Sequence, residues 1–317
     1  VARFNAKVAE IEHVERLEVN LDAFQAARVQ AIQASGLNLV LADGTSHSLP
    51  YRSDIEGLVP SDLAVLLTSD VGGAKRFATL RDVGLDKDGL VPPLAIKSED
   101  LHEGWKSQWE AADVILDVDN KSLTHRPDMW GHRGFAREVA ALFDRRLLPA
   151  QSLCETLTIV ESDSTLTVLN QAQAACSALS GLRVDHAHFC SSDVRYASRL
   201  INIGYRRRNA MIDMTNYAMA DWGHPMHAYD ADKLAGDTLC VRFAKQDEKL
   251  DLLDGTSLAL TAQDLVIADA QKPVALAGIM GGKNDSVQQT TQALVLEVGC
   301  FHAATVRRAS ARHKVRT

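Results

Sequence analysis

Three segments of this chain place polar side chains beside small residues, a combination typical of a pocket for a small polar ligand. They are residues 212–230 (IDMTNYAMADWGHPMHAYD), 273–282 (PVALAGIMGG) and 294–300 (LVLEVGC). None of the three contains a metal-ligand set, a nucleophile paired with a base, or a phosphate-binding loop. We therefore predict a site that recognises a small polar ligand and is not built around a side-chain nucleophile.

Thr215 and Asn216 are adjacent inside a segment, residues 209–222, that we expect to be helical. Both residue types are neutral to poor in helix interiors, because their side chains compete for backbone hydrogen bonds. They are therefore candidates for a site. The alternative is that the Thr215 hydroxyl bonds a carbonyl of its own helix and Asn216 faces water.

His227 follows that helix in a Gly-His-Pro-Met-His segment, which we expect to be a loop stiffened by Pro225. His224 and His227 are three residues apart, but no third ligand of a suitable type stands nearby, so we predict no metal site.

Glu297 lies in a predicted strand, on the face opposite Leu294, Leu296 and Val298. It is either on the wet side of a half-buried strand or at the floor of a pocket, where Val295 and Gly299 leave space. In the second case its carboxylate would accept a hydrogen bond from a ligand hydroxyl. Ala277 and Gly278 belong to a turn of small residues. Either the small side chains let a ligand approach the backbone closely, or the turn is tight and needs a positive φ.

The composition bounds the class of protein. The 317 residues suggest two or three domains, and 46% hydrophobic and 24% charged residues are typical of a globular protein. Three features favour the cytoplasm. The five cysteines are scattered and form no CxxC pair, no apolar run reaches the ~18–20 residues that cross a bilayer, and no signal peptide opens the chain. The net charge of −7 does not suggest a general nucleic-acid binder, although basic clusters at 206–208 and 307–316 are either phosphate contacts or solvated faces.

Patterning along the chain predicts an α+β fold with a largely antiparallel sheet. Short strands and turns over residues 22–96 suggest a small all-β barrel. Helices are expected over residues 131–143, 193–203 and 209–222, the last ending at Gly223, and another begins near Ala303. The expected strands are 113–118, 157–160, 178–184, 239–244, 249–253, 257–260, 265–268, 273–277 and 294–298.

The three segments, in this order, resemble the editing domain of the bacterial-type phenylalanyl-tRNA synthetase beta subunit. A further block, residues 119–142 (DNKSLTHRPDMWGHRGFAREVAAL), resembles the segment that precedes that domain in the same family. The resemblance runs from about Asp113 to the last residue. Because the chain begins with Val and ends inside a basic run, we expect it to be part of a longer gene product.

The resemblance implies a multidomain α+β organisation. Residues 1–21 and 101–150 would form a split N-terminal domain with an α/β segment, and 22–100 an inserted, oligonucleotide-fold-like barrel. This insertion lacks the family's His-Pro-Asn-Ala-Asp signature, so we do not assign tRNA binding to it. Residues 151–317 would be the larger editing domain, truncated at its C-terminal end.

The resemblance also implies a function and a division of roles. A separate catalytic alpha subunit, with ATP and Mg²⁺, charges tRNA(Phe) in a heterotetramer, whereas the beta subunit hydrolyses tRNA carrying tyrosine. Glu297 would recognise the tyrosine phenol, the backbone at Ala277 and Gly278 would shape the wall, and Thr215, Asn216 and His227 would be the catalytic group that holds the ester, the water or the terminal adenosine. No cofactor is expected in this part, and no membrane partner.

Several residues depart from the family pattern. Trp222 and His224 replace residues of other types, Arg207 and Ala210 disrupt a usual Pro-Ile-Asn-Asn run, and the chain ends where the family continues into a segment that closes the pocket. The alternative function is therefore a non-catalytic RNA-binding or assembly module that kept the fold.

Overall fold

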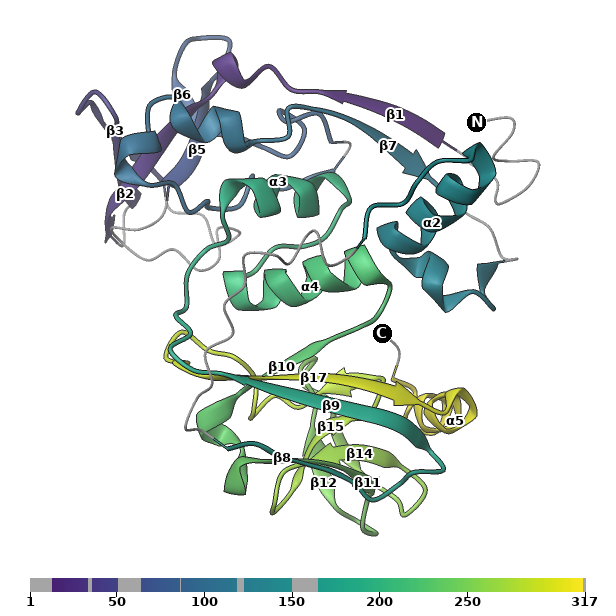
Figure 1. The fold of residues 1–317 in the computed structure, drawn as a ribbon. Coiled ribbons are helices and arrows are strands. Elements are labelled where there is room, and N and C mark those ends of the chain that lie inside the picture. Colours follow the sequence, from purple (N-terminus) through teal and green to yellow (C-terminus); the bar gives the residue numbers. More distant parts are fainter. Residues whose placement is uncertain are drawn as a thin grey trace. The chain divides into compact units, whose positions relative to one another are not determined.

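A computed structural model describes residues 13–33, 36–50, 64–85, 87–118, 123–149 and 165–315 (Figure 1). The chain divides into two compact units. The first unit is Val1–Arg145 with Cys190–Gly223, and the second unit is Arg146–Phe189 with His224–Thr317. The strand predicted at 157–160 lies outside the described residues.

The first unit contains a five-stranded antiparallel sheet, as the turn-rich pattern of residues 22–96 predicted. Its strand order is β4 (Ser46–Leu49), β3 (Gly36–Leu41), β2 (Gln25–Gln33), β5 (Ala64–Ser69) and β6 (Lys75–Phe77). Alternate residues of these strands, among them Leu37, Leu39 and Leu67, pack into one buried cluster. Closure of this sheet into a complete barrel stays a prediction.

A separate two-stranded ribbon joins β1 (His13–Glu18) to β7 (Ala112–Asp117) in antiparallel register. The strand β7 starts and ends one residue before the predicted 113–118. The paired residues Glu18 and Ala112 are 94 positions apart in the sequence, because the five-stranded sheet is inserted between the two strands.

The described part of the first unit contains three α-helices, and each begins and ends within one residue of its prediction. They are α2 (His132–Phe143), α3 (Val194–Asn202) and α4 (Ala210–Trp222). The Asn209 side chain caps α4 by accepting from the amide of Ile212 at 3.1 Å. Gly223 ends α4 with a φ of 73°, a left-handed conformation that glycine adopts without a steric cost.

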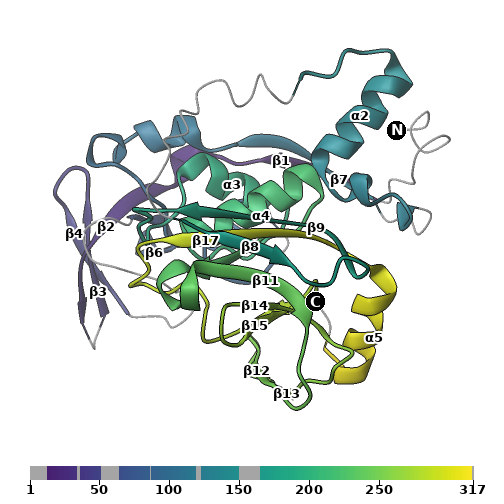
Figure 2. The same cartoon turned by 60° about the horizontal axis from the view of Figure 1, so that its bottom comes forward.

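The second unit is built from two sheets, and Figures 1 and 2 show one lying over the other. The three-stranded sheet has the order β10 (His227–Asp230), β17 (Leu294–Phe301), β9 (Cys176–Val184). The five-stranded sheet has the order β16 (Met280–Gly281), β15 (Pro273–Leu276), β14 (Leu265–Ala268), β11 (Thr238–Phe243), β8 (Thr167–Asn170). Apolar side chains from both, such as Val295, Leu239 and Ile267, form one buried cluster.

A hairpin of β12 (Lys249–Asp251) and β13 (Ser257–Ala259) and the helix α5 (Ala303–His313) complete this unit. The pair β8 and β11 is parallel, whereas the other described strand pairs are antiparallel. The predicted α+β class with a mainly antiparallel sheet is therefore confirmed.

Besides the two-residue β16, which was expected to be part of a turn, two strands of the second unit were not predicted. The segment His227–Asp230, expected to be a loop, is β10, and Thr167–Asn170 is β8. Each strand has four residues, too few for alternation to distinguish it from a loop. Both are stabilised by hydrogen bonding to a strand distant in the sequence, since β10 pairs with β17 and β8 with β11.

The two compact units differ from the predicted domains in one respect. We placed all of residues 151–317 in one domain, but Cys190–Gly223 belongs to the first unit. The physical reason is the apolar face of α3, whose Val194, Ala197 and Ile201 share a buried cluster with Leu94 and Trp105. The three-part division at residues 21, 100 and 150 otherwise stays a prediction.

Candidate ligand-binding site

Three residues of the second unit line up across the three-stranded sheet. Glu297 on β17 is the direct partner of His227 on β10 and of Gly181 on β9. Directly opposed residues of neighbouring strands point to the same face of a sheet. Tyr229 stands two residues after His227 and therefore points to that face as well. The strand pairing thus gathers an acid, an imidazole and a phenol.

The shared face is the inner one, against the five-stranded sheet. A Cβ added to Gly181 would lie 3.0 Å from the Val168 side chain and 3.3 Å from that of Leu239, which belong to β8 and β11. Tyr229 is fully buried in the cluster between the sheets. Glu297 therefore points into the protein interior, not into water.

Glu297 is only 7% exposed. Burial raises the pKa of its carboxyl to about 7, and a hydrogen bond from Tyr229 acts in the opposite direction. The Tyr229 hydroxyl donates to Oε2 of Glu297 at 3.4 Å. Of the two interpretations of the strand pattern, the wet-side position is therefore wrong, and the acid is enclosed.

The His227 ring is held between Tyr229 and Gly281. It meets the Tyr229 ring edge-on, with centroids 4.6 Å apart and planes at 70°. A Cβ on Gly281 would lie 2.3 Å from its Cε1 and 2.4 Å from its Nε2, so only glycine leaves room for the ring in this position. Gly281 thus has a steric role that its sequence context did not reveal.

The enclosed His227 ring is neutral near pH 7. Burial lowers its pKa to about 4. Its Nε2 is buried and has no hydrogen-bond partner among the residues that the structure describes. A buried polar atom of this kind costs free energy unless a ligand or water satisfies it.

Ala277 and Gly278 lie in the turn that follows β15. Ala277 is buried, and Gly278 has a φ of 69°, so the expected positive φ is present. A Cβ on Gly278 would lie 3.0 Å from the Phe301 ring and 3.2 Å from Val306. The turn therefore packs against the end of β17 and the start of α5, and its contact with a ligand stays a prediction.

Gly299 does not leave the open space that we expected beside Glu297. A Cβ at Gly299 would lie 2.3 Å from Cζ of Phe301, so the aromatic ring occupies that position. A register shift between Cys300 and Phe301 allows the ring to fold back over the glycine, a feature that strict strand alternation could not predict. Phe301 is consequently a further residue beside the candidate site.

Thr215 and Asn216 lie in α4, in the first unit. The Thr215 hydroxyl donates to the Ile212 carbonyl at 2.8 Å, which is the local hydrogen bond of our alternative interpretation. Asn216 is half-buried. Because α4 and the strands with His227 and Glu297 belong to different units, the convergence of all four residues on one ligand stays a prediction.

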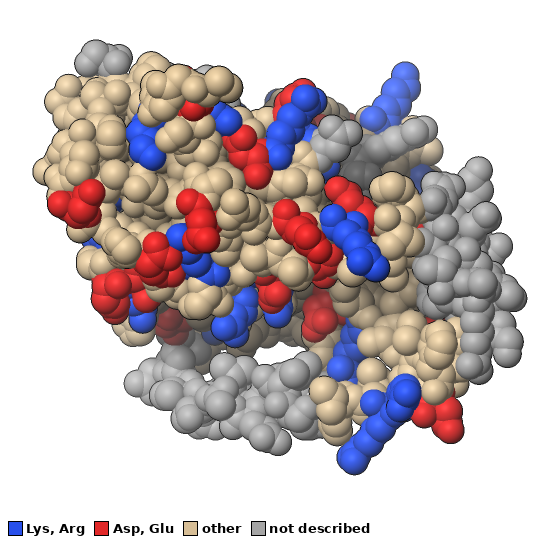
Figure 3. Space-filling view, turned by 90° about the horizontal axis from the view of Figure 1, so that it is seen from above, with Lys and Arg blue, Asp and Glu red and all other residues tan. Residues whose placement is uncertain are grey.

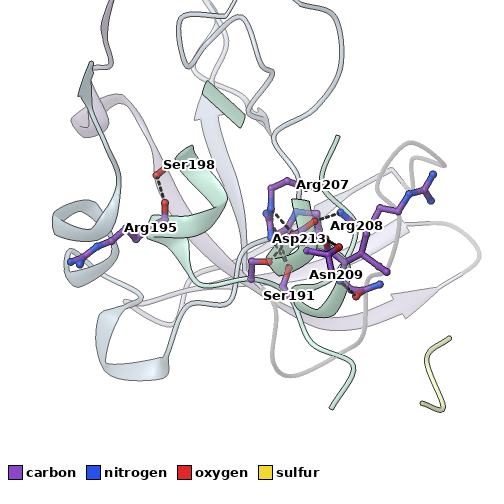
Figure 4. A network of polar contacts seen from close by, with 11 residues as sticks. Ser191, Arg195, Ser198, Arg207, Arg208, Asn209 and Asp213 are labelled. Carbon is purple, nitrogen blue, oxygen red and sulfur yellow. Dashed lines mark hydrogen bonds and ion pairs between the residues drawn. The ribbon is translucent and has the colours of Figure 1, made fainter. Parts of the chain in front are cut away.

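The start of α4 is fixed by a buried ion pair (Figure 4). Arg207 Nε lies 3.1 Å from Asp213 Oδ2, and both side chains are about 1% exposed. Asp213 also accepts from the Ser192 hydroxyl at 2.7 Å and from the Arg208 amide at 2.8 Å. Arg207 donates to the Pro93 carbonyl at 3.0 Å. Arg207, one of the basic residues considered as a phosphate contact, therefore has a structural role.

The basic run at the end of the chain is also partly used inside the protein. Arg312 and His313 both contact Asp264, a fully buried carboxylate, with His313 Nε2 at 2.8 Å. These contacts attach the last turn of α5 to the segment before β14. On the face shown in Figure 3, Lys and Arg lie among Asp and Glu over the described residues, so neither sign dominates there.

An open depression of about 560 Å³ lies in the first unit, and its lining includes Arg28, Lys97, Gln108, Ser191 and Asp193. None of the predicted site residues lines it. In the described part of the chain, no helix is both long and apolar enough to cross a membrane.

Residues 175–317 match a protein family described as the B3/4 domain. Among curated relatives, the phenylalanine–tRNA ligase beta subunit of Solibacter usitatus is 41% identical over 205 residues, which are 65% of this chain and 26% of the relative. That of Anaeromyxobacter dehalogenans is 31% identical over 341 residues, 99% of this chain and 42% of the relative. The chain is similar in sequence to these beta subunits.

The resemblance expected from the sequence motifs is thereby confirmed, and the chain spans less than half the length of either relative. A solved N-terminal fragment of the phenylalanyl-tRNA synthetase beta subunit from Pyrococcus horikoshii is 16% identical, with a TM-score of 0.35 over 65% of this chain and 63% of that one. The B3/4 match includes all six predicted site residues.

Sequence reasoning found Glu297 and His227 but missed Tyr229, Gly281 and Phe301. The alternation of His227 and Tyr229 was a signal for a common face, but the segment was interpreted as a loop. For Gly281 and Phe301 the sequence holds no comparable signal, because their contacts come from strands and turns distant along the chain.

Proposed function

We propose that this chain carries the proofreading site of a phenylalanine–tRNA ligase beta subunit, which hydrolyses the ester of tyrosine wrongly attached to tRNA(Phe). The observation that supports this most is the pairing of Glu297, a buried acid, with His227, a neutral imidazole whose Nε2 lacks a partner. Relatives named as beta subunits of this ligase support the assignment to that ligase.

Glu297 suits recognition of a phenol. Tyrosine differs from phenylalanine by one hydroxyl, and a site built to bond that hydroxyl rejects the analogue without it by as much as ~10⁴–10⁵. The discrimination arises because the polar group of the site is otherwise buried unpaired. A carboxyl with a pKa near 7 can accept from the phenol when ionised, and it can still accept through its carbonyl oxygen when protonated.

His227 suits the binding of an ester, a water molecule or a terminal adenosine. A neutral imidazole offers one donor and one acceptor, and a pKa of about 4 keeps it neutral over the physiological range. We assign Thr215 and Asn216, together with His227, to the residues that hold the ester, the water or the terminal adenosine. We assign the backbone at Ala277 and Gly278 to the wall of the pocket. With no nucleophile paired to a base in these segments, attack by a positioned water is the mechanism that we propose.

The remaining parts of the proposal concern the longer protein. A separate alpha subunit would form phenylalanyl-adenylate with ATP and Mg²⁺ and charge the tRNA, in the cytoplasm. The chain described here would need neither cofactor for hydrolysis of the ester.

The test is deacylation of Tyr-tRNA(Phe) and Phe-tRNA(Phe) by the 317-residue chain and by its variants. Glu297→Ala should remove the preference for the tyrosyl ester, because the partner of the phenol is lost. His227→Ala should slow the hydrolysis of both esters.

Glu99→Ala is the matched control, since Glu99 is an exposed acid of the first unit. Equal rates for the native chain and both site variants, at equal binding of tRNA, would favour the RNA-binding or assembly module instead.

A further inference from the structure

We infer that Tyr229 is a positioning residue for Glu297: its hydroxyl binds Oε2, so that Oε1 is the oxygen available to a bound phenol. The inference rests on the proposed function for the identity of that ligand. The contact between Tyr229 and Glu297 is a property of the folded second unit and is independent of the proposed function.

The strand register explains how Tyr229 reaches Glu297. Tyr229 is directly opposite Val295, so Glu297 is its diagonal neighbour on the adjacent strand. Diagonal neighbours are ~7–8 Å apart, a distance that a tyrosine side chain spans. The hydroxyl and the carboxylate oxygen are 3.4 Å apart, and both residues are buried.

The direction of this hydrogen bond is fixed by chemistry. Burial, followed by the negative charge of Glu297, raises the pKa of the Tyr229 phenol well above its ordinary value. The phenol therefore keeps its proton and donates, and the carboxylate oxygen accepts. The Tyr229 ring also packs against His227, so one fixed side chain orients both functional groups.

The division between the two carboxylate oxygens follows from the described contacts. Oε2 accepts from Tyr229, while no described residue donates to Oε1. A fully buried oxygen without a partner would belong with the unsatisfied atoms such as His227 Nε2. Oε1 does not, so part of its surface is exposed. A phenol from the ligand would therefore make with Oε1 the same type of hydrogen bond that Tyr229 makes with Oε2.

Other groups that influence this pair are few. His227 faces Glu297 from β10. Burial raises the pKa of the Cys176 thiol on β9, and the charge of Glu297 makes a smaller contribution in the same direction. Asp285 adds a smaller negative contribution at Tyr229 and is itself paired with Lys272. Tyr229 is the group that stabilises ionised Glu297 by hydrogen bonding.

Tyr229→Phe tests the inference, because it removes the hydroxyl and preserves the ring. The Glu297 carboxyl is followed by carbon-13 NMR in the labelled chain and assigned with Glu297→Gln. Its titration midpoint should move to higher pH in Tyr229→Phe, since the hydrogen bond that lowers the pKa is lost. Tyr196→Phe, which removes a hydroxyl from α3 in the first unit, should leave the midpoint unchanged.

The kinetic arm measures hydrolysis of Tyr-tRNA(Phe) and Phe-tRNA(Phe) by the same variants. Loss of one hydrogen bond should reduce kcat/KM for the tyrosyl ester about three- to tenfold and leave the phenylalanyl ester nearly unchanged. A thermal unfolding midpoint close to that of the native chain establishes that Tyr229→Phe folds.

The two arms separate failure of the inference from failure of the proposed function. A shifted midpoint in a chain that hydrolyses neither ester supports the role of Tyr229 and contradicts the proofreading function. An unchanged midpoint overturns the inference, whether or not the esters are hydrolysed.

Discussion

His227 and Glu297 should have opposite effects on the pH dependence of stability, and single substitutions should separate them. Burial raises the pKa of Glu297 from 4.5 to about 7 and lowers that of His227 from 6.5 to about 4. The folded state thus binds more protons than the unfolded state at Glu297 and fewer at His227. Because the two residues are direct cross-strand partners, the same sheet contains both effects.

The sign of each contribution follows from proton linkage. Stability falls as pH rises wherever the folded state holds the additional proton, which for Glu297 is the range from about 4.5 to about 7. Stability rises with pH wherever the unfolded state holds it, which for His227 is the range from about 4 to about 6.5. A difference of 2.5 pH units corresponds to on the order of 3 kcal/mol for each group, so in the native chain the two contributions largely cancel.

Glu297→Gln should therefore unmask a rise in the free energy of unfolding between pH 4.5 and 6.5. His227→Asn should unmask a fall over nearly the same range. The measurement is urea unfolding followed by far-ultraviolet circular dichroism at several pH values. All four tryptophans lie in the first unit, so their fluorescence follows that unit separately and should give the same pH profile in every variant.

The reasoning would be refuted by profiles of the two variants that run parallel to the native one. Such a result would mean that neither group changes its pKa on folding. Their enclosure between the sheets would then have no effect on ionisation.

Three further substitutions test the packing around the site and the anchor of α4. Gly281→Ala should slow hydrolysis of the tyrosyl ester about as much as removal of the His227 imidazole, because the added Cβ would lie 2.3 Å from the ring. Gly72→Ala is the control and should have no effect, because its added Cβ would be 3.4 Å from its nearest neighbour. Native rates in Gly281→Ala would show that the ring position is unimportant. Arg207→Ala should destabilise the first unit by about 3–5 kcal/mol in a tryptophan-monitored urea titration, because Asp213 would be left buried without its charged partner. Asp213→Asn should destabilise the first unit by a similar amount, since it leaves the buried Arg207 guanidinium without its counter-charge, and a native free energy of unfolding in either variant would contradict this account.

Local physical chemistry made much of the secondary structure predictable. Helix α4 was predicted over residues 209–222 with Gly223 at its end, and it is observed over Ala210–Trp222 with Gly223 as its C-cap. Strand β17 was predicted from alternation, which also separated Glu297 from Leu294 and Leu296. The motifs around His227 and Glu297 indicated the family, because residue types and their order carry that information without a fold.

Alternation could not decide which face of β17 is the inner one. That depends on the five-stranded sheet, whose strands come from residues 167–281 and cover Glu297 only after folding. The pairing of Glu297 with His227 joins positions 70 residues apart, and the short strand β10 forms because β17 provides its hydrogen bonds.

The sequence by itself therefore determined most of the elements, the antiparallel α+β class and the residues able to do chemistry, since caps, turns and periodicity act within a few residues. Only the tertiary structure decided that Glu297 is buried, that Tyr229 bonds it, that Phe301 fills the space beside Gly299, and that Thr215 and Asn216 belong to a different compact unit. The physical reason is that burial and pKa depend on atoms brought together from distant strands, and these interactions exist only when the sheets are packed.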